Sequence, residues 1–271
     1  MTGRRATTEF DVSAAPLIRL RNPTRCSVCG THLPPRSEAR WDKSVRAATC
    51  RACVEGRGTP GASAARKNQR LRERREQRAR DRFGRLGGVY LAFTDDPQTT
   101  KAWEIGSQGE RALGRYLETL HDGESIIVLH DRRIPGTRAN VDHIAIAPTG
   151  VHVIDAKNYA GKVERVDVGR LLSTEWQLRV GGRDCTKFVD GLHKQVAAVR
   201  SSLAGELDVE VHAAMCFTRA EWSLFARPFE VGGVWIGWAK ALGKRLQAPG
   251  PLDVAAVQLV AGRLAAALPC A

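Results

Sequence analysis

Hydrophobic residues recur at helical spacing in three stretches of the last two thirds of the chain. Residues 107–121 carry three leucines on one face, and residues 186–204 carry an aliphatic stripe at spacings of three and four. Residues 252–268 are also apolar, but charged and amide side chains interrupt them. Such spacing is typical of amphipathic helices that bury one face, so we predict a helix in each stretch.

Shorter stretches between these helices alternate apolar and polar residues or are uniformly apolar, which is typical of strands. Pro148-Thr149-Gly150 separates two of them and predicts a hairpin. The predicted strands are residues 125–130, 140–147, 151–157, 161–168, 171–180, 209–217 and 231–238. Helices that alternate with strands predict a mixed α/β domain with a central sheet, which we assign to residues 87–271.

The first third of the chain has a different composition. Residues 1–21 show no periodicity and are interpreted as a loose arm, whereas residues 22–56 hold four of the seven cysteines. Residues 57–86 begin with glycine, proline and alanine and continue as an arginine-rich linker or helix. We find no secretory signal and no run of roughly 18 apolar residues. We therefore expect a cytoplasmic protein without membrane contact.

The net charge of +13 is confined to the first third. Residues 1–85 contain 21 Lys and Arg against 8 Asp and Glu, whereas the remaining residues contain 21 of each class. A basic module joined to a neutral domain indicates a polyanionic partner for that module. Nucleic acid is the partner that we expect, and a basic tail that aids solubility is the alternative.

The four clustered cysteines form two CxxC pairs, at Cys26 and Cys29 and at Cys50 and Cys53. Each tight turn presents two thiolates, and four thiolates complete a tetrahedral zinc shell. In a reducing compartment, paired cysteines indicate metal rather than disulfides. The pattern predicts a small zinc ribbon or knuckle with structural Zn²⁺; two redox dithiols or free cysteines are the alternatives.

The arginine-rich run contains ten Lys and Arg against three acids between Arg66 and Arg85. On a helix, residues four apart share a face, and like charges there repel one another unless an anion neutralises them. Phosphates of nucleic acid would supply that anion, and a charged spacer is the alternative. The predicted phosphate contacts are Arg66, Lys67, Arg70, Arg74, Arg75 and Arg78.

The predicted hairpin carries the strongest chemical signal. Asp155 and Lys157 are two residues apart, so their side chains share one face of the strand. If Ile146 pairs with Val151, Asp142 comes opposite Asp155 on that face, whereas a loop shorter by one residue would turn Asp142 away. Two facing carboxylates repel each other unless a divalent cation lies between them, and Mg²⁺ prefers such oxygen ligands.

Two further polar residues border buried stripes. Glu110 lies on the inward face of residues 107–121, where it either serves the same site or closes a capping box at the helix start. Gln195 borders the stripe of residues 186–204 and is either a site residue or a half-exposed helix residue.

The order of these motifs resembles the nuclease-related (NERD) domain of the PD-(D/E)XK nuclease superfamily, over roughly residues 101–218. The motifs are Gly109-Glu110-Arg111, Val141-Asp142-His143, Asp155-Ala156-Lys157 and Lys194-Gln195. The family usually has Glu where Asp155 stands, and Asp is an accepted variant. The resemblance implies a restriction-endonuclease-like fold, a mixed central sheet flanked by helices.

The resemblance also implies roles for individual residues. Glu110, Asp142 and Asp155 would surround a catalytic Mg²⁺ or Mn²⁺, Lys157 would act at the water or the scissile phosphate, and Gln195 would orient the site. The expected activity is metal-dependent phosphodiester hydrolysis, with DNA as the expected substrate. The rivals are a nuclease fold that only binds nucleic acid and a protein-binding adaptor built on the zinc module.

Overall fold

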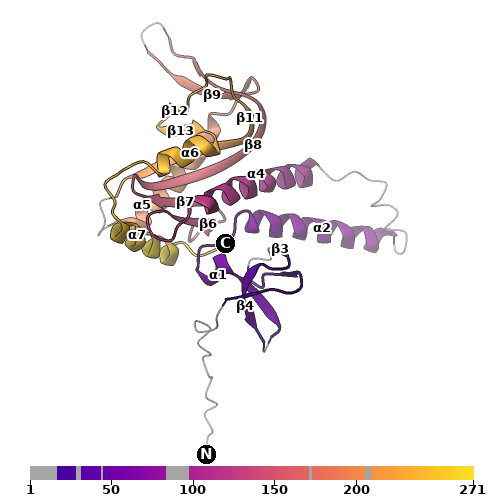
Figure 1. The fold of residues 1–271 in the computed structure, drawn as a ribbon. Helices are drawn as coiled ribbons and strands as arrows, with labels where there is room; N and C mark the ends of the chain where they lie inside the picture. The colour runs from indigo at the N-terminus through magenta and orange to yellow at the C-terminus, as the bar shows by residue number, and fades with distance from the viewer. Residues whose placement is uncertain (1–16, 29–31, 44, 84–97, 171–172, 205–208) are drawn as a thin grey trace, which may run out of the picture. The chain divides into compact units, whose positions relative to one another are not determined.

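The computed structural model describes residues 17–28, 32–43, 45–83, 98–170, 173–204 and 209–271. The chain divides into two compact units, Met1–Glu55 and Gly56–Ala271 (Figure 1). The basic helix that the sequence analysis set apart from the main domain belongs to the second unit. Most of the predicted N-terminal arm, together with Cys29, lies outside the described residues.

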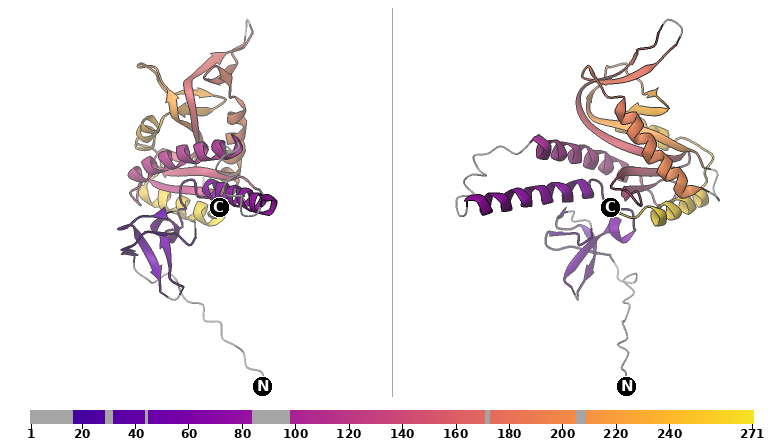
Figure 2. Two further views of the ribbon diagram at one scale, coloured as in Figure 1. Left: turned by 90° about the vertical axis from the view of Figure 1, so that its right-hand side faces the viewer. Right: turned by 180° about the vertical axis from the view of Figure 1, so that it is seen from behind.

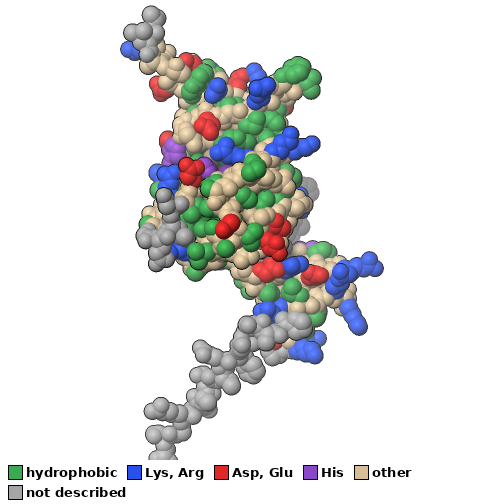
Figure 3. Space-filling view, turned by 60° about the vertical axis from the view of Figure 1, so that its left-hand side comes forward, with side chains coloured by type: hydrophobic (Ala, Val, Ile, Leu, Met, Phe, Trp, Pro, Cys, Tyr) green, Lys and Arg blue, Asp and Glu red, His purple; other side chains and the backbone are tan. Residues whose placement is uncertain are grey.

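The smaller unit is built from short strands with few apolar side chains between them. Its three-stranded sheet has the order β1 (Leu17–Arg19), β4 (Glu38–Asp42), β5 (Ala47–Cys50), and all pairs are antiparallel. β2 (Thr24–Arg25) pairs with β3 (His32–Leu33), and α1 (Arg51–Val54) follows β5. Several Lys and Arg side chains project from this unit in Figure 3. So small an apolar core leaves folding dependent on another source of stability.

Among the described residues, eight strands form the central sheet of the larger unit. They are β6 (Ile127–Arg133), β7 (Asn140–Ala147), β8 (Gly150–Asp167), β9 (Trp176–Val180), β10 (Arg183–Asp184), β11 (Val211–Glu221), β12 (Phe229–Val231) and β13 (Val234–Gly237). The long strand β8 is central: its first part pairs with β7, its last part pairs with β9, and β11 lies parallel to it on the other side. β6 extends the sheet beyond β7, while β13 and β12 extend it beyond β11.

Helices cover both faces of this sheet. α4 (Gln98–Leu120) and α6 (Ala239–Leu246) pack on one face through a core around Leu113, Leu117 and Leu242. α5 (Lys187–Leu203) and α7 (Val254–Ala267) pack on the other face through a larger aliphatic core. The basic helix α2 (Ala62–Phe83) runs beside α4 (Figures 1 and 2). The predicted mixed α/β fold with a helix-flanked central sheet is confirmed.

Several elements differ from the sequence predictions; the predicted strand 231–238, for example, is replaced by the antiparallel pair β12 and β13. α4 starts at Gln98 rather than near residue 107, because its first turns are polar and lack the spacing of a buried stripe. The two strands predicted between residues 151 and 168 are one continuous strand, because the ladder with β11 continues past Gly161. α6 was not predicted, because one short helix follows directly after an apolar strand. None of the described helices is long and apolar enough to span a membrane.

Candidate active site

The register of the β7–β8 hairpin brings two predicted acids together. Ile146 pairs with Val151, as predicted, with residues 148–149 as a tight turn. Continuing the same register one step beyond the last ladder pair places Asp142 opposite Asp155. Directly opposed residues of an antiparallel pair point to the same face, so the predicted pairing of the two carboxylates is present.

Main-chain and side-chain hydrogen bonds hold both acids in place. Oδ2 of Asp142 accepts the N–H of Ala156 at 3.1 Å. Nζ of Lys157 lies 2.7 Å from Oδ2 and 3.0 Å from Oδ1 of Asp155, whose residue is only 5% exposed. The same ammonium stands 4.7 Å from the ring centroid of Phe188 on α5. Lys157 is therefore the cation of this carboxylate pair.

Glu110 reaches the site from the middle of α4. It does not close a capping box, because the helix begins well before it. Its side chain is buried, and Oε1 accepts the N–H of Gly61 at 2.9 Å. The preceding Gly109 permits the close approach, since a Cβ there would lie 2.6 Å from Cβ of Asn158 and 2.8 Å from Oγ1 of Thr218. A larger residue at this position would push α4, and Glu110 with it, away from β8 and β11.

A fourth carboxylate, Asp131 on β6, was missed by the sequence analysis. In the β6–β7 ladder His130 pairs with His143 and Arg132 pairs with Val141, so Asp131 lies across from Asp142. It is 2% exposed, adopts a positive φ of 48° and accepts hydrogen bonds from Oγ of Ser63 at 2.6 Å and Nδ2 of Asn140 at 3.1 Å. The signal in the sequence that could have indicated Asp131 is a charged residue that follows an apolar strand. Asp131 also accepts the N–H of Ser63, and so it stabilises the first turn of α2.

The four acids share one electrostatic environment. Burial, followed by the charges of Asp131 and Asp155, raises the pKa of Glu110 to about 8. Burial, with Glu110 and Asp155 nearby, raises the pKa of Asp142 well above its usual range. Burial lowers the pKa of Lys157, but the Asp155 and Asp142 carboxylates outweigh it and raise that pKa overall. The site therefore holds more potential negative charge than Lys157 alone neutralises.

Behind the acids lies a buried histidine pair. Nδ1 of His130 and Nδ1 of His143 are 2.8 Å apart, and Nε2 of His130 lies 2.7 Å from Oε1 of Glu118. Arg57 donates to the same oxygen at 2.6 Å. Although burial opposes ionisation, these bonds and charges lower the pKa of Glu118 to about 2. The network fixes β6 and β7 to α4 next to Asp131 and Asp142.

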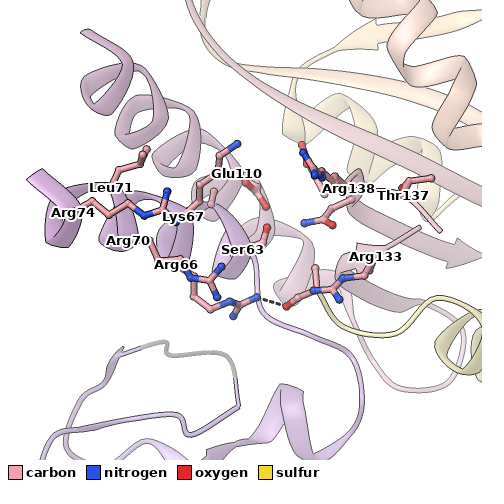
Figure 4. A pocket seen from close by; sticks show the side chains of 14 residues that line it. Ser63, Arg66, Lys67, Arg70, Leu71, Arg74, Glu110, Arg133, Thr137 and Arg138 are labelled. Atoms are coloured by element: carbon pink, nitrogen blue, oxygen red, sulfur yellow. Dashed lines mark hydrogen bonds between the residues drawn. The ribbon is translucent and has the colours of Figure 1, made fainter. Parts of the chain in front are cut away.

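A cavity of about 720 Å³ opens over two of the acids. Glu110 and Asp142 line it, while Asp155, Lys157 and Gln195 do not. Figure 4 shows basic side chains of α2 on one side and those of the β6–β7 segment on the other, with Glu110 and Ser63 between them. The lining cations are Arg66, Lys67, Arg70 and Arg74 from α2, with Arg133 and Arg138 opposite.

The remaining predicted site residues lie outside this cavity. Gln195 is half-buried on α5, and its buried Oε1 has no hydrogen-bond partner among the described residues. Arg78 is exposed on α2 beyond the cavity, and the side chain of Arg75 lies outside the described part of the chain. The structure thus gathers four of the six predicted phosphate contacts around the acids.

The smaller unit gathers three cysteines. The Sγ atoms of Cys26, Cys50 and Cys53 lie within 4.8 Å of one another, and the N–H of Cys50 donates to Sγ of Cys26 at 3.3 Å. Among the described residues this is the only group of three or more His, Cys, Asp and Glu whose ligand atoms come so close. Soft thiolates at this separation can bind a metal ion.

Part of the chain is similar in sequence to known proteins. Residues 105–218 match the sequence model of the nuclease-related domain, NERD. A segment of 59 residues is 42% identical to an uncharacterized protein of Bacillus anthracis; it makes up 21% of this chain and spans about 27% of the relative's length. No solved structure matches the chain. Over residues 105–218 the chain is thus similar to the nuclease-related domain, NERD, and this range contains the gathered acids and Lys157.

Proposed function

We propose that the larger unit is a metal-dependent nuclease that hydrolyses phosphodiester bonds, with DNA as its substrate. The observation that carries the proposal is a cavity lined by Glu110, Asp142 and six cations, with the Asp155–Lys157 ion pair next to Asp142 on the hairpin. Carboxylates hold a divalent cation, and arginines hold phosphates. Both features in one site fit a reaction at the phosphodiester backbone.

The donor set fits Mg²⁺ or Mn²⁺. The candidate ligands are the carboxylates of Asp142, Asp155 and Glu110 and the main-chain carbonyl of Ala156. Among the described residues, the oxygens of these three carboxylates do not all lie within 4.8 Å of one another. Mg²⁺ is commonly held by one or two carboxylates and keeps several waters, so Glu110 would contribute directly or through water. The raised pKa values of Glu110 and Asp142 favour a site that takes up a cation when both groups ionise.

The protein's own residues supply the remaining functions. Lys157 stays protonated, since neighbouring carboxylates raise its pKa, and it would donate a hydrogen bond to the attacking water or to the scissile phosphate. Gln195 offers a buried amide oxygen without a partner among the described residues, and it would orient the site. The divalent cation, when bound, lowers the pKa of a water molecule and neutralises charge that develops on the phosphate.

The smaller unit is proposed to bind structural Zn²⁺ through Cys26, Cys50, Cys53 and Cys29. The fourth cysteine lies outside the described residues, and its CxxC spacing from Cys26 supports the assignment. Zinc binding supplies on the order of 10 kcal/mol of folding free energy in small modules, which this unit needs because its apolar core is small. Its basic surface favours a role in holding nucleic acid.

Cleavage assays test the nuclease proposal. Supercoiled plasmid, linear duplex, single-stranded DNA and RNA are incubated with Mg²⁺ or Mn²⁺ and the parent protein, Lys157→Ala or Lys162→Ala. Lys162 is the matched control, because it is exposed on the same strand and pairs with Glu164 instead. We expect cleavage by the parent and Lys162→Ala and loss of about 10²–10³-fold in Lys157→Ala. Binding without cleavage of any substrate would make the domain a binding module.

A further inference from the structure

The cavity over the acids has two facing basic walls. One wall is the first half of α2, with Arg66, Lys67, Arg70 and Arg74, and the other carries Arg133 and Arg138 (Figure 4). Glu110 and Asp142 lie between them. A polyanion seated there would be contacted from both sides, whereas a basic patch on an open surface contacts it from one side only.

Hydrogen bonds to the site residues hold the first turn of α2, and with it the α2 wall, in a fixed position. The N–H of Ser63 and its hydroxyl both donate to Asp131, and the N–H of Gly61 donates to Glu110. The Arg66 guanidinium donates to the backbone oxygen of Ala271. α2 lies outside the range matched by the family model, so the match itself does not describe this wall.

The size of the cavity limits what can reach the acids. Treated as a sphere, a volume of 720 Å³ corresponds to a diameter of about 11 Å, less than the roughly 12 Å width of a duplex major groove alone. The cavity itself is therefore too small to enclose a complete duplex, and its size is closer to that of one extended strand. An intact duplex would have to lie across the mouth, away from Asp142.

The chemistry of the lining selects the backbone over the bases. No aromatic residue is among the described residues that line the cavity, so it offers no surface on which bases stack. Besides the cations, it presents the polar side chains of Ser63, Thr137 and Asn140. Arginine, hydroxyl and amide groups contact phosphates and sugars without reading sequence.

We propose that this cavity is a channel for one strand of nucleic acid, gripped through its phosphates by α2 on one side and by Arg133 and Arg138 on the other. The proposal rests on the proposed function for the role of the acids. The substrate segment presented to Asp142 is then single-stranded: a free strand, a flap or a frayed end. Because the contacts are to phosphates, the cavity would hold a strand of any base sequence.

Binding measured without cleavage tests the proposal. Fluorescence anisotropy with Ca²⁺ in place of Mg²⁺ follows a labelled single-stranded DNA oligonucleotide and the same oligonucleotide annealed to its blunt-ended complement. The full chain is compared with Arg70→Ala/Arg74→Ala, which alters the α2 wall, and Arg133→Ala/Arg138→Ala, which alters the opposite wall. Arg170→Ala/Arg183→Ala is the matched control, because both arginines are exposed on the larger unit and neither lines the cavity.

Each wall variant should weaken single-strand binding and leave duplex binding nearly unchanged. Loss of two phosphate contacts should lower the salt slope by about 1.4, which corresponds to roughly twenty-fold weaker binding at 0.1 M salt. The control pair should bind like the parent. Equal losses for duplex and single strand, or no loss from the Arg133 and Arg138 pair, would overturn the channel.

The nuclease proposal and the channel proposal can be refuted independently of each other. If the wall variants lose single-strand binding while no substrate is ever cleaved, the channel stands and the nuclease activity is wrong. If Lys157→Ala abolishes cleavage while both wall variants bind single strands like the parent, the nuclease stands and the channel is wrong.

Discussion

Replacement of Glu110 by glutamine tests the electrostatics of the site directly. Glu110 is 8% exposed, and its pKa is raised from 4.5 to about 8. A carboxyl with a higher pKa in the folded state destabilises the fold as it ionises. The loss of folding stability is absent below pH 4.5, where the carboxyl is protonated in both states, and is complete above about pH 8, where it is ionised in both states. One pKa unit is worth about 1.4 kcal/mol, so the ionised side chain costs about 5 kcal/mol as an upper value.

Glutamine keeps an oxygen that accepts the Gly61 N–H and cannot ionise. The parent, without added Mg²⁺, should lose stability as the pH rises from 5 to 9, and Glu110→Gln should lose less and be the more stable protein at pH 9. Urea unfolding followed by tryptophan emission measures this, since Trp235 lies in the core of the larger unit. Mg²⁺ should stabilise the parent more than the variant at high pH. Identical pH dependence in both proteins, or a variant that is weaker at every pH, would refute the reasoning.

Two further predictions concern packing and metal content. Gly114→Ala should destabilise the protein by about 1–3 kcal/mol and lower its melting temperature, because the new Cβ would lie 2.3 Å from the Pro60 ring. Gly106→Ala on the same helix is the control and should not lower the melting temperature, because the added Cβ meets open space. Equal melting temperatures for the two variants would contradict this packing. Cys50→Ser should release zinc that the parent retains after dialysis, as measured by elemental analysis, while Cys185→Ser, which lies outside the cysteine cluster, should retain it. If the parent protein contains no zinc after dialysis, the zinc proposal is wrong.

The hydrophobic pattern determined the secondary structure of the larger unit well, because burial imposes local spacing on each element. The stripe of α5 is buried as predicted, and so is the inward face of α4 around Leu113 and Leu117. The hairpin could also be predicted to the register, since a polar turn between two apolar strands leaves few pairings that keep both faces consistent. The sequence therefore offered the pairing of Asp142 with Asp155 conditionally, and the register in the structure decided it.

The sequence alone left Glu110 between a cap and a site residue, and it did not detect Asp131. Both outcomes follow from contacts between elements far apart in the chain. Glu110 becomes a site residue because Gly109 lets α4 approach β8, and because Gly61 arrives to hydrogen-bond it. Asp131 joins the acids through a register with β7 that periodicity cannot reveal.

The role of the arginine-rich segment shows the same division. Composition and charge pattern determined that it is basic, compatible with a helix and suited to phosphates. Only the tertiary structure decided that α2 packs along α4, that Asp131 accepts hydrogen bonds at its first turn, and that four of its cations face Arg133 and Arg138 across the acids. The physical reason is that charge and periodicity are local properties of a sequence, whereas a cavity exists only where separate elements pack against one another.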